Sequence, residues 1–173
     1  QRQMCIRDSY MMGERSPFWH THARGVLFGL SLATSRGAII RAILEGTVFA
    51  MLHNIQIARE AGVTVNELRS VGGGTRSALW NQIKADILGI PIELPEAPIG
   101  APFGDAMLVG MGLGLFPDIP GTLKQIVRVK TVYQPNPEHH AAYQPIYRLF
   151  RNLYTHLRED FDDAASIYAA VTT

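Results

Sequence analysis

Hydrophobic positions along the chain follow two patterns, short apolar runs and longer segments with helical spacing. The clearest helical segment is 36–61, where apolar residues recur every three or four positions. Ser35 supplies an N-cap for this helix and Gly62 a stop. Its apolar stripe is wide, so we expect it to be largely buried. The same spacing predicts further helices at 77–88, at 104–115 and from after Pro137 to about 160.

Short apolar runs predict strands between these helices. They lie at 26–32, 67–71, 91–94 and 127–133, and a Pro-Gly turn at 120–121 precedes the last of them. We expect the first strand to be mostly buried. Because strands alternate with helices, the sequence predicts an α/β fold, with parallel pairing where a helix connects two strands.

Both ends of the chain fall outside this pattern. Residues 1–9 have no periodicity, and we interpret them as a non-native scar or a disordered tail. We expect 161–173 to be a frayed tail. The predicted domain is therefore 10–160.

Composition narrows the class of protein. Of the 173 residues, 47% are hydrophobic and 18% charged, which favours a folded domain. The 16 basic residues balance the 15 acidic ones, which argues against binding to nucleic acid or an anionic membrane. Gly, Arg or Glu interrupt the apolar runs well before the ~20 residues that a bilayer helix needs. The single cysteine, Cys5, excludes an internal disulfide, so we expect a reduced, cytoplasmic protein.

The strongest local motif is a strand, a triple glycine and a helix. Glycine allows a positive φ angle and a close backbone approach to a ligand, and a helix N-terminus attracts anions. The motif is neither G-x-G-x-x-G nor a P-loop. A phosphate site and a tight turn with a serine cap are equally good interpretations. The residues concerned are Gly72, Gly73, Gly74, Thr75 and Ser77.

A second glycine-rich loop, 100–106, opens a helix with further glycines at 104, 110, 112 and 114. Each glycine inside a helix costs about 1 kcal/mol relative to alanine. Close packing of another backbone explains that cost better than direct contact with a ligand.

Several titratable residues crowd the loop before residue 26. His20 and His22 could share one side of an extended segment, but no third metal ligand is evident, so we expect no metal site. Contact of Arg15 with a phosphate or a sugar hydroxyl is more plausible. Elsewhere, Glu45 is either a paired buried charge or faces a cleft. We expect His53 on a helix flank and 139–140 in solvent, and we find no nucleophile paired with a base.

Two of these segments carry a resemblance. The loop GERSP at 13–17 and the stretch GGGTRSALWNQIKAD at 72–86, with the long helix between them, resemble the C-terminal domain of FGGY-family carbohydrate kinases. Within the family the chain is most similar to the xylulokinases, over about 10–160. The resemblance implies a ribonuclease H-like, actin-like ATPase domain, incomplete at its N-terminal edge. It also implies that ATP and a sugar bind between this domain and a second one.

The resemblance assigns roles to individual residues. The glycine motif maps to the nucleotide site, the 104–115 helix to an interdomain hinge, and the 13–17 loop to the substrate side. The implied residues are Gly72, Gly73, Gly74, Thr75 and Ser77 for the nucleotide, Gly104 and Asp105 for the hinge, and Glu14 and Arg15 for the substrate-side loop.

The family's D-x-G-T/S phosphate motif and its general-base Asp are absent and are expected upstream of this segment. The implied partners are therefore ATP, a small sugar, the N-terminal domain of the same enzyme, and Mg²⁺ held largely by that domain. A homodimer is left open. We expect part of an ATP-dependent kinase, acting on D-xylulose, that has no catalytic residue and no activity by itself. The alternatives are a non-catalytic nucleotide- or phosphate-binding module and a scaffold domain.

Overall fold

The first long helix, α1 (Arg36–Glu60), begins and ends where its local signals predict. The Ser35 hydroxyl accepts a hydrogen bond from the backbone N–H of Ala38 at 3.1 Å. Gly62, at φ +85°, follows its C-terminus.

The structure is a computed structural model and describes residues 6–7, 11–96, 100–116 and 118–172.

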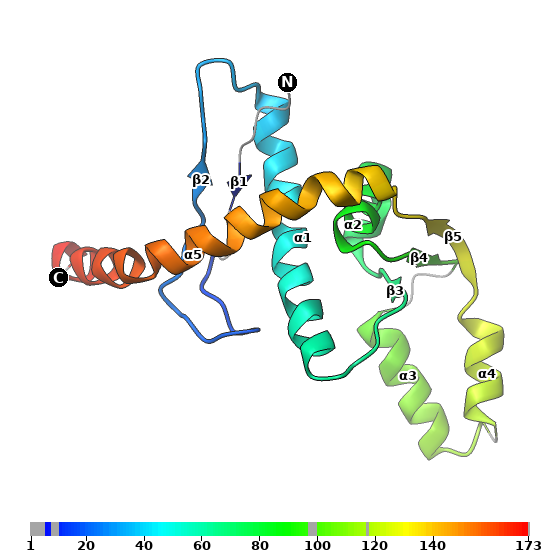
Figure 1. The fold of residues 1–173 in the computed structure, drawn as a ribbon. Helices are drawn as coiled ribbons and strands as arrows, with labels where there is room; N and C mark the ends of the chain where they lie inside the picture. The colour runs from blue at the N-terminus through cyan, green and yellow to red at the C-terminus, as the bar shows by residue number, and fades with distance from the viewer. Residues whose placement is uncertain (1–5, 8–10, 97–99, 117, 173) are drawn as a thin grey trace.

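Short strands and helices alternate along the rest of the chain (Figure 1). In order they are β1 (Ile6–Arg7), β2 (Leu27–Phe28), α1, β3 (Leu68–Arg69), the 3₁₀ turn η1 (Gly73–Arg76), α2 (Ala78–Leu88), β4 (Ile92–Pro95), α3 (Ala101–Gly112), α4 (Ile119–Ile126), β5 (Val129–Tyr133) and α5 (Pro137–Thr172).

Three of these strands form one sheet in the order β3-β4-β5. The β3–α2–β4 unit pairs its strands in parallel, as predicted for a helical crossover, and β5 lies antiparallel to β4. The predicted buried strand at 26–32 is wrong in extent and burial. Only Leu27 and Phe28 pair, with the β1 backbone, and both side chains are exposed. The other residues in the segment assigned to a scar, 1–5 and 8–9, lie outside the described part of the chain.

The hydrophobic core lies where α1, α2 and α5 meet. Phe49 on α1 and Phe150 on α5 are almost fully buried, with ring centroids 5.5 Å apart. From α2, Ile83 and Ile87 are buried in the same cluster. We expected α1 to be largely buried, but it is buried mainly on one side, and its Ile40 is 58% exposed.

By length and composition α1 contains a stretch apolar enough to cross a bilayer, contrary to our prediction. The core helix of a soluble protein meets the same criterion. Here Val48 and Leu52 of this stretch are buried in the protein core. The finding is therefore weak evidence for a membrane helix.

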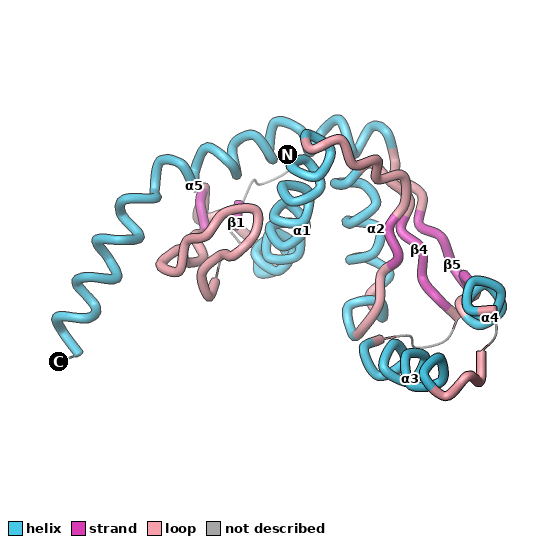
Figure 2. The backbone as a smooth tube through the Cα atoms, turned by 90° about the horizontal axis from the view of Figure 1, so that it is seen from below, coloured by secondary structure: helices cyan, strands magenta, loops and turns pink. Residues whose placement is uncertain are grey.

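Helix α5 continues to Thr172, so the predicted frayed tail is wrong over 161–172, and residue 173 lies outside the described part of the chain. Phe161 is only 8% exposed and packs against the ring of His20, at a centroid distance of 6.0 Å. The alanines that follow also have the highest helix propensity. Figure 2 shows the C-terminal half of α5 extending well beyond α1.

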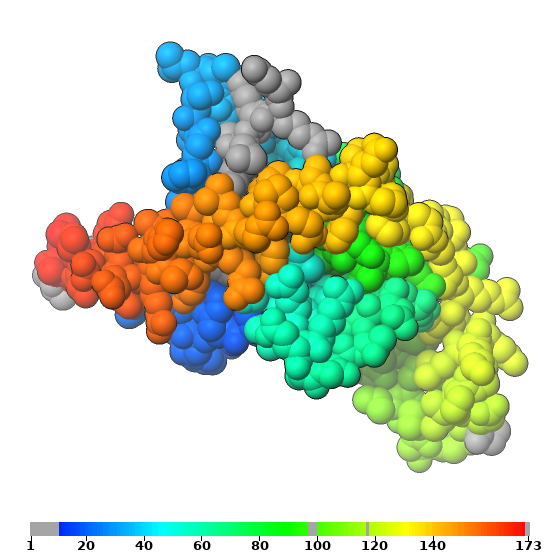
Figure 3. All heavy atoms as spheres, in the orientation of Figure 1, coloured from blue at the N-terminus to red at the C-terminus, as the bar shows by residue number. Residues whose placement is uncertain are grey.

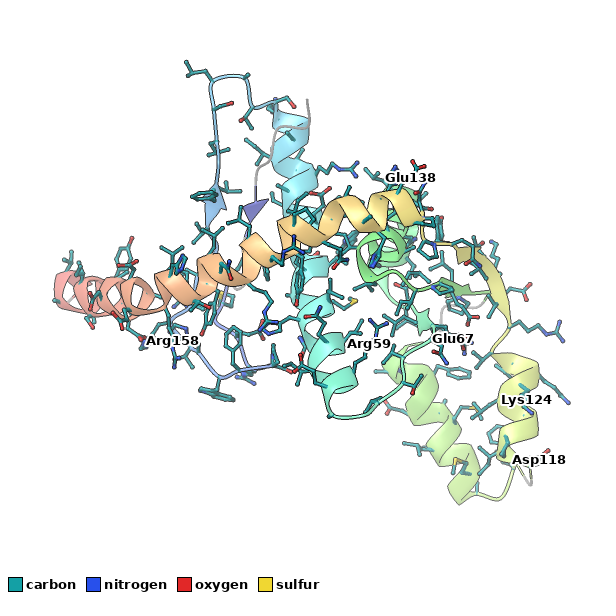
Figure 4. The ribbon with its side chains drawn as sticks, in the orientation of Figure 1. Arg59, Glu67, Asp118, Lys124, Glu138 and Arg158 are labelled. Atoms are coloured by element: carbon teal, nitrogen blue, oxygen red, sulfur yellow. The ribbon has the colours of Figure 1, made fainter. Side chains whose placement is uncertain are left out.

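Helix α4 occupies the segment in which we predicted only a Pro-Gly turn. The Asp118 carboxylate caps it by accepting a hydrogen bond from the Gly121 N–H at 3.0 Å. Pro120 lies in the first turn, where its missing N–H costs nothing. Asp118 and Lys124, at opposite ends of α4, complement the helix dipole (Figure 4).

Candidate functional site

A pocket of about 580 Å³ lies at the edge of the sheet where β3 and β4 end and β5 begins. Its volume is in the range of small-molecule sites, and the carboxyl ends of parallel strands are where α/β proteins bind ligands. Four segments line it, the glycine turn, the end of β4, the residue before α3, and β5. The lining residues are Val71, Gly72, Gly73, Thr75, Arg76, Leu94, Pro95, Glu96, Gly100, Lys130 and Thr131.

Gly72 makes the turn that opens the pocket. Its φ of +83° and ψ of −169° lie in a region that essentially only glycine adopts. Its carbonyl accepts hydrogen bonds from Thr75, from the hydroxyl at 2.7 Å and from the backbone N–H at 3.2 Å. The turn is therefore closed by its own residues.

The next two glycines differ in what surrounds them. A Cβ atom at Gly73 meets nothing within 4 Å, whereas one at Gly74 lies 2.7 Å from the ring of Trp80. Gly73 also lines the pocket, and Gly74 does not. Gly73 thus leaves free space beside the pocket because it has no side chain. Gly74, which also has none, makes room for the Trp80 ring.

Ser77 caps α2, as one of our two interpretations of the motif held. Its hydroxyl accepts a hydrogen bond from the backbone N–H of Trp80 at 3.2 Å. Of the residues predicted for the nucleotide site, the structure brings Gly72, Gly73 and Thr75 to the pocket but not Gly74 or Ser77.

Two cationic residues at the pocket were missed by the sequence analysis. Arg76 lines it beside Thr75, and Lys130 lines it from β5. Arg76 lies inside the motif itself and could have been found there. Lys130 is more than fifty positions further along the chain, so only the β4–β5 pairing reveals it. Glu96 is the single carboxylate among the described lining residues.

A buried polar network on α2 supports the glycine turn. The Asn81 side chain, fully buried, donates to the Thr75 carbonyl at 2.8 Å. The Lys84 ammonium donates to Ser70 Oγ at 2.9 Å and to Asn81 Oδ1 at 3.2 Å. Burial lowers the pKa of Lys84. These bonds connect α2 to the Ser70 side chain before the glycines and to the Thr75 backbone after them, so both ends of the turn are anchored.

Asp86, the last residue of the 72–86 stretch, joins α2 to the start of α5. Its carboxylate accepts hydrogen bonds from the Asn136 N–H at 3.0 Å and from Gln82 at 2.8 Å, and it pairs with His139 at 2.9 Å. Burial alone raises the pKa of this carboxyl, but the bonds from Asn136, His139 and Gln82 outweigh it, so the net shift is downward. The predicted solvation of 139–140 is wrong, because His140 also bonds to the Asp86 carbonyl.

The two hinge candidates lie outside the pocket. Gly104 and Asp105 are exposed on α3 and do not line it. The prediction that another backbone packs closely against the α3 glycines is wrong at Gly110, where a Cβ would strike the side-chain ring of Phe116. At Gly104 and Gly112 it is wrong for the described chain, since a Cβ there meets nothing within 4 Å.

The predicted substrate-side loop is also remote from the pocket, on the other side of α1 (Figures 1 and 2). The Glu14 carboxylate accepts bonds from the N–H groups of Arg15 and Ser16, at 2.7 and 3.0 Å. The Arg15 guanidinium lies 5.5 Å from the centre of the Trp19 ring. The structure thus does not bring these residues together with the glycine turn.

Two further expectations about α1 are resolved. Glu45 is a paired charge, because it accepts bonds from Arg41 at 2.7 Å and from the Tyr143 hydroxyl at 2.6 Å. Burial, and then the bond to Glu45, raises the pKa of Tyr143 to about 12. His53 is buried, not on the helix flank, and its Nδ1 lacks a hydrogen-bond partner within the described residues.

Comparison with known proteins supplies the context for this site. The family model described as "FGGY family of carbohydrate kinases, C-terminal domain" matches residues 2–113. A xylulose kinase from Staphylococcus epidermidis is 32% identical over 158 residues, or 91% of this chain and 32% of the relative. One from Bacillus subtilis is 33% identical over 150 residues, or 87% of this chain and 30% of the relative. Other relatives are named autoinducer-2 kinase and glycerol kinase.

Solved structures agree with this result. A xylulose kinase from Lactobacillus acidophilus superposes with a TM-score of 0.82 at 26% identity, covering 92% of this chain and 32% of its own. The chain therefore spans about a third of the length of the relatives that it matches. Its architecture is the predicted actin-like ATPase fold of these kinases. On the family match and the shared fold together, the chain belongs to the FGGY family of carbohydrate kinases.

Proposed function

We propose that this chain supplies the nucleotide-binding part of an ATP-dependent carbohydrate kinase, and that ATP binds in the pocket at the glycine turn. The observation that carries this proposal is Gly73. Its missing side chain leaves open space at the pocket, next to a turn that is fixed by Gly72, Thr75 and Asn81. A rigid backbone that a ligand can approach closely is what a nucleotide requires.

The charges at the pocket suit the anionic part of the ligand. Arg76 and Lys130 supply two cations, from the turn and from β5, and phosphate oxygens are their natural partners. Glu96 alone is not a Mg²⁺ site, since magnesium prefers several oxygen ligands. Any Mg²⁺ that accompanies ATP is then held by phosphates and by other parts of the enzyme.

The reaction proposed for the whole enzyme is transfer of the γ-phosphoryl group to a sugar hydroxyl. The hydroxyl oxygen bonds to the γ-phosphorus while the bond to the β–γ bridging oxygen breaks, and ADP leaves. The hydroxyl proton goes to a general base. We place that base outside this chain, so the chain's own residues bind and orient ATP.

Nucleotide titration of the purified chain tests the site. We expect ATP to raise the melting temperature, and Gly73→Val to weaken ATP binding at least tenfold because its methyl groups enter the pocket. Gly112→Val is the matched control, since Gly112 is equally open but lies at the end of α3 outside the pocket. Equal ATP affinity in the two variants contradicts the site. No effect of ATP on the parent chain favours a scaffold domain.

D-xylulose is the proposed acceptor. It is supported by the relatives named xylulose kinase, at 32 and 33% identity. We expect the purified chain to show no xylulose-dependent ADP formation. A chimaera in which this chain replaces the matching third of the Bacillus subtilis enzyme should restore it. Xylulose-dependent turnover by the chain alone contradicts the assignment of the base, and a folded but inactive chimaera contradicts the proposed role of this domain.

A further inference from the structure

A cluster of metal-ligating side chains lies far from the pocket, where the loop before β2 meets the C-terminal half of α5. It consists of His20, His22 and Asp162, whose ligand atoms all lie within 4.8 Å of one another. Asp162 Oδ1 is 3.1 Å from His20 Nε2 and 2.8 Å from His22 Nδ1. Asp162 is the third ligand that the sequence spacing did not reveal. Figure 4 labels Arg158 on the same stretch of α5.

His20 is positioned by its surroundings. Its backbone forms two hydrogen bonds with Glu14, at 2.8 and 2.9 Å, and its side chain is only 9% exposed. Its Nδ1 lies 3.0 Å from the Tyr154 hydroxyl. This contact directs the opposite ring nitrogen, Nε2, toward Asp162. A hydrogen bond at the non-ligating nitrogen is the usual way in which proteins orient a metal-binding histidine.

The other two ligands leave the cluster open to ions from solvent. The side chains of His22 and Asp162 are 49% and 54% exposed. Two imidazoles and one carboxylate are a common ligand set for zinc, with water as the fourth ligand.

The separations of the donor atoms are also close to those around a zinc ion. Zinc bonds of about 2.0–2.2 Å in a tetrahedral arrangement place the donor atoms roughly 3.3–3.5 Å apart. The two measured separations, 3.1 and 2.8 Å, are shorter by only a few tenths of an ångström. The two histidine nitrogens also lie within 4.8 Å of each other, so all three donor atoms are close enough to share one ion after the side chains adjust.

We propose that His20, His22 and Asp162 bind one divalent transition-metal ion, with Zn²⁺ as the favoured ion. The bound ion joins two segments that are about 140 residues apart in the chain. Because the ligands are not assembled in the unfolded chain, binding stabilises the fold and holds the loop against α5.

Calorimetric titration of the full 173-residue chain with ZnCl₂ tests the proposal, together with thermal melts with and without zinc. We expect one ion per chain and a rise in melting temperature. His22→Gln and Asp162→Asn each remove one ligand and should lower zinc affinity at least tenfold. Both side chains are half exposed, so both variants should fold, which circular dichroism checks. Tyr154→Phe should weaken binding less.

Matched controls separate this site from other zinc-binding groups. Asp163→Asn and His156→Gln remove an exposed carboxylate and an exposed imidazole on α5 that lie outside the cluster. Both should keep the affinity of the parent chain, and Gly73→Val should keep it too. The proposal is overturned if the parent chain does not bind zinc, or if His22→Gln and Asp162→Asn bind it as tightly as the controls do.

Discussion

The region where α1, α2 and α5 meet and the region formed by α3 and α4 use apolar side chains in opposite ways. In the first, Phe49, Ile83 and Phe150 are buried. In the second, apolar side chains face outward, with Leu108 65% and Leu113 71% exposed on and just after α3. Figure 3 shows α3 and α4 projecting from the rest of the molecule.

The contrast separates a packed region from an open one. Helices α1, α2 and α5 bury part of their apolar surface against one another, around Phe49 and Phe150. An outward apolar surface such as that of α3 is typical of a face that another part of the protein covers. Such a partner fits a chain that spans about a third of its relatives' length. The proposed nucleotide pocket lies between the two regions, lined by the β3–α2 turn and by the residue before α3.

The largest loss of stability is expected from Phe150→Ala, which removes a side chain from the core between α1, α2 and α5. Phe150 is fully buried and packs against Phe49 and Tyr147. Removing a buried aromatic ring costs about 3–5 kcal/mol of unfolding free energy. Urea unfolding of the purified chain measures this loss. A cost below about 1 kcal/mol contradicts the assignment of the core.

A smaller loss is expected at the glycine turn from Gly74→Ala. The added methyl group lies 2.7 Å from the Trp80 ring, and overpacking of this kind typically costs about 1–3 kcal/mol. Gly73→Ala is the matched control, because its methyl group enters open space and should leave the unfolding free energy nearly unchanged. Equal losses in the two variants would show that the glycines do not differ in role.

Asp86→Asn should destabilise the joint between α2 and α5 by about 1–3 kcal/mol, since it disturbs a carboxylate that accepts three hydrogen bonds. The pH dependence has a defined sign. The pKa of Asp86 is lowered from 3.8, so its contribution is present above about pH 4 and is lost as pH falls through the folded-state pKa. The difference in stability between parent and variant should therefore shrink at acid pH, as urea unfolding across pH 2–6 would measure.

The smallest effect is expected in the α3 region. Leu108→Gln replaces an exposed apolar side chain, so the unfolding free energy should change by less than about 0.5 kcal/mol. We expect the exposed α3 face to make the isolated chain self-associate at high concentration, and the same substitution to reduce that association, as sedimentation velocity would show. A large loss of stability instead would mean that α3 belongs to the core.

Elements with local signals could be predicted from the sequence. Ser35 and Ser77 cap α1 and α2 with their own hydroxyls, and Gly62 and Gly89 end these helices at positive φ. Such signals depend only on neighbouring residues, which is why the bounds agree within one or two positions. Leu79, Ile83 and Ile87 recur at helical spacing on α2, which predicts one buried face. Ile83 and Ile87 are buried as this spacing predicts, but Leu79 is 54% exposed.

The features that could not be predicted from the sequence depend on contacts between residues far apart in the chain. Lys130 reaches the pocket through the pairing of β5 with β4, and His139 reaches Asp86 because α5 begins beside α2. The extension of α5 follows from contacts of Phe161 with the N-terminal loop. Helix α4, in contrast, was missed for a local reason, because a proline in the first turn of a helix was interpreted as part of a turn.

Helix α5 is long enough to connect two distant parts of the molecule. Its 36 residues, at 1.5 Å per residue, correspond to a rod of about 54 Å. One end is joined to α2 through Asp86, and the far half contacts the loop that carries His20. A pair of fluorophores at the two ends would report any bend at Pro145 as a change in transfer efficiency. The helix therefore joins, within one continuous element, the end of α2 at Asp86 and the loop that carries His20.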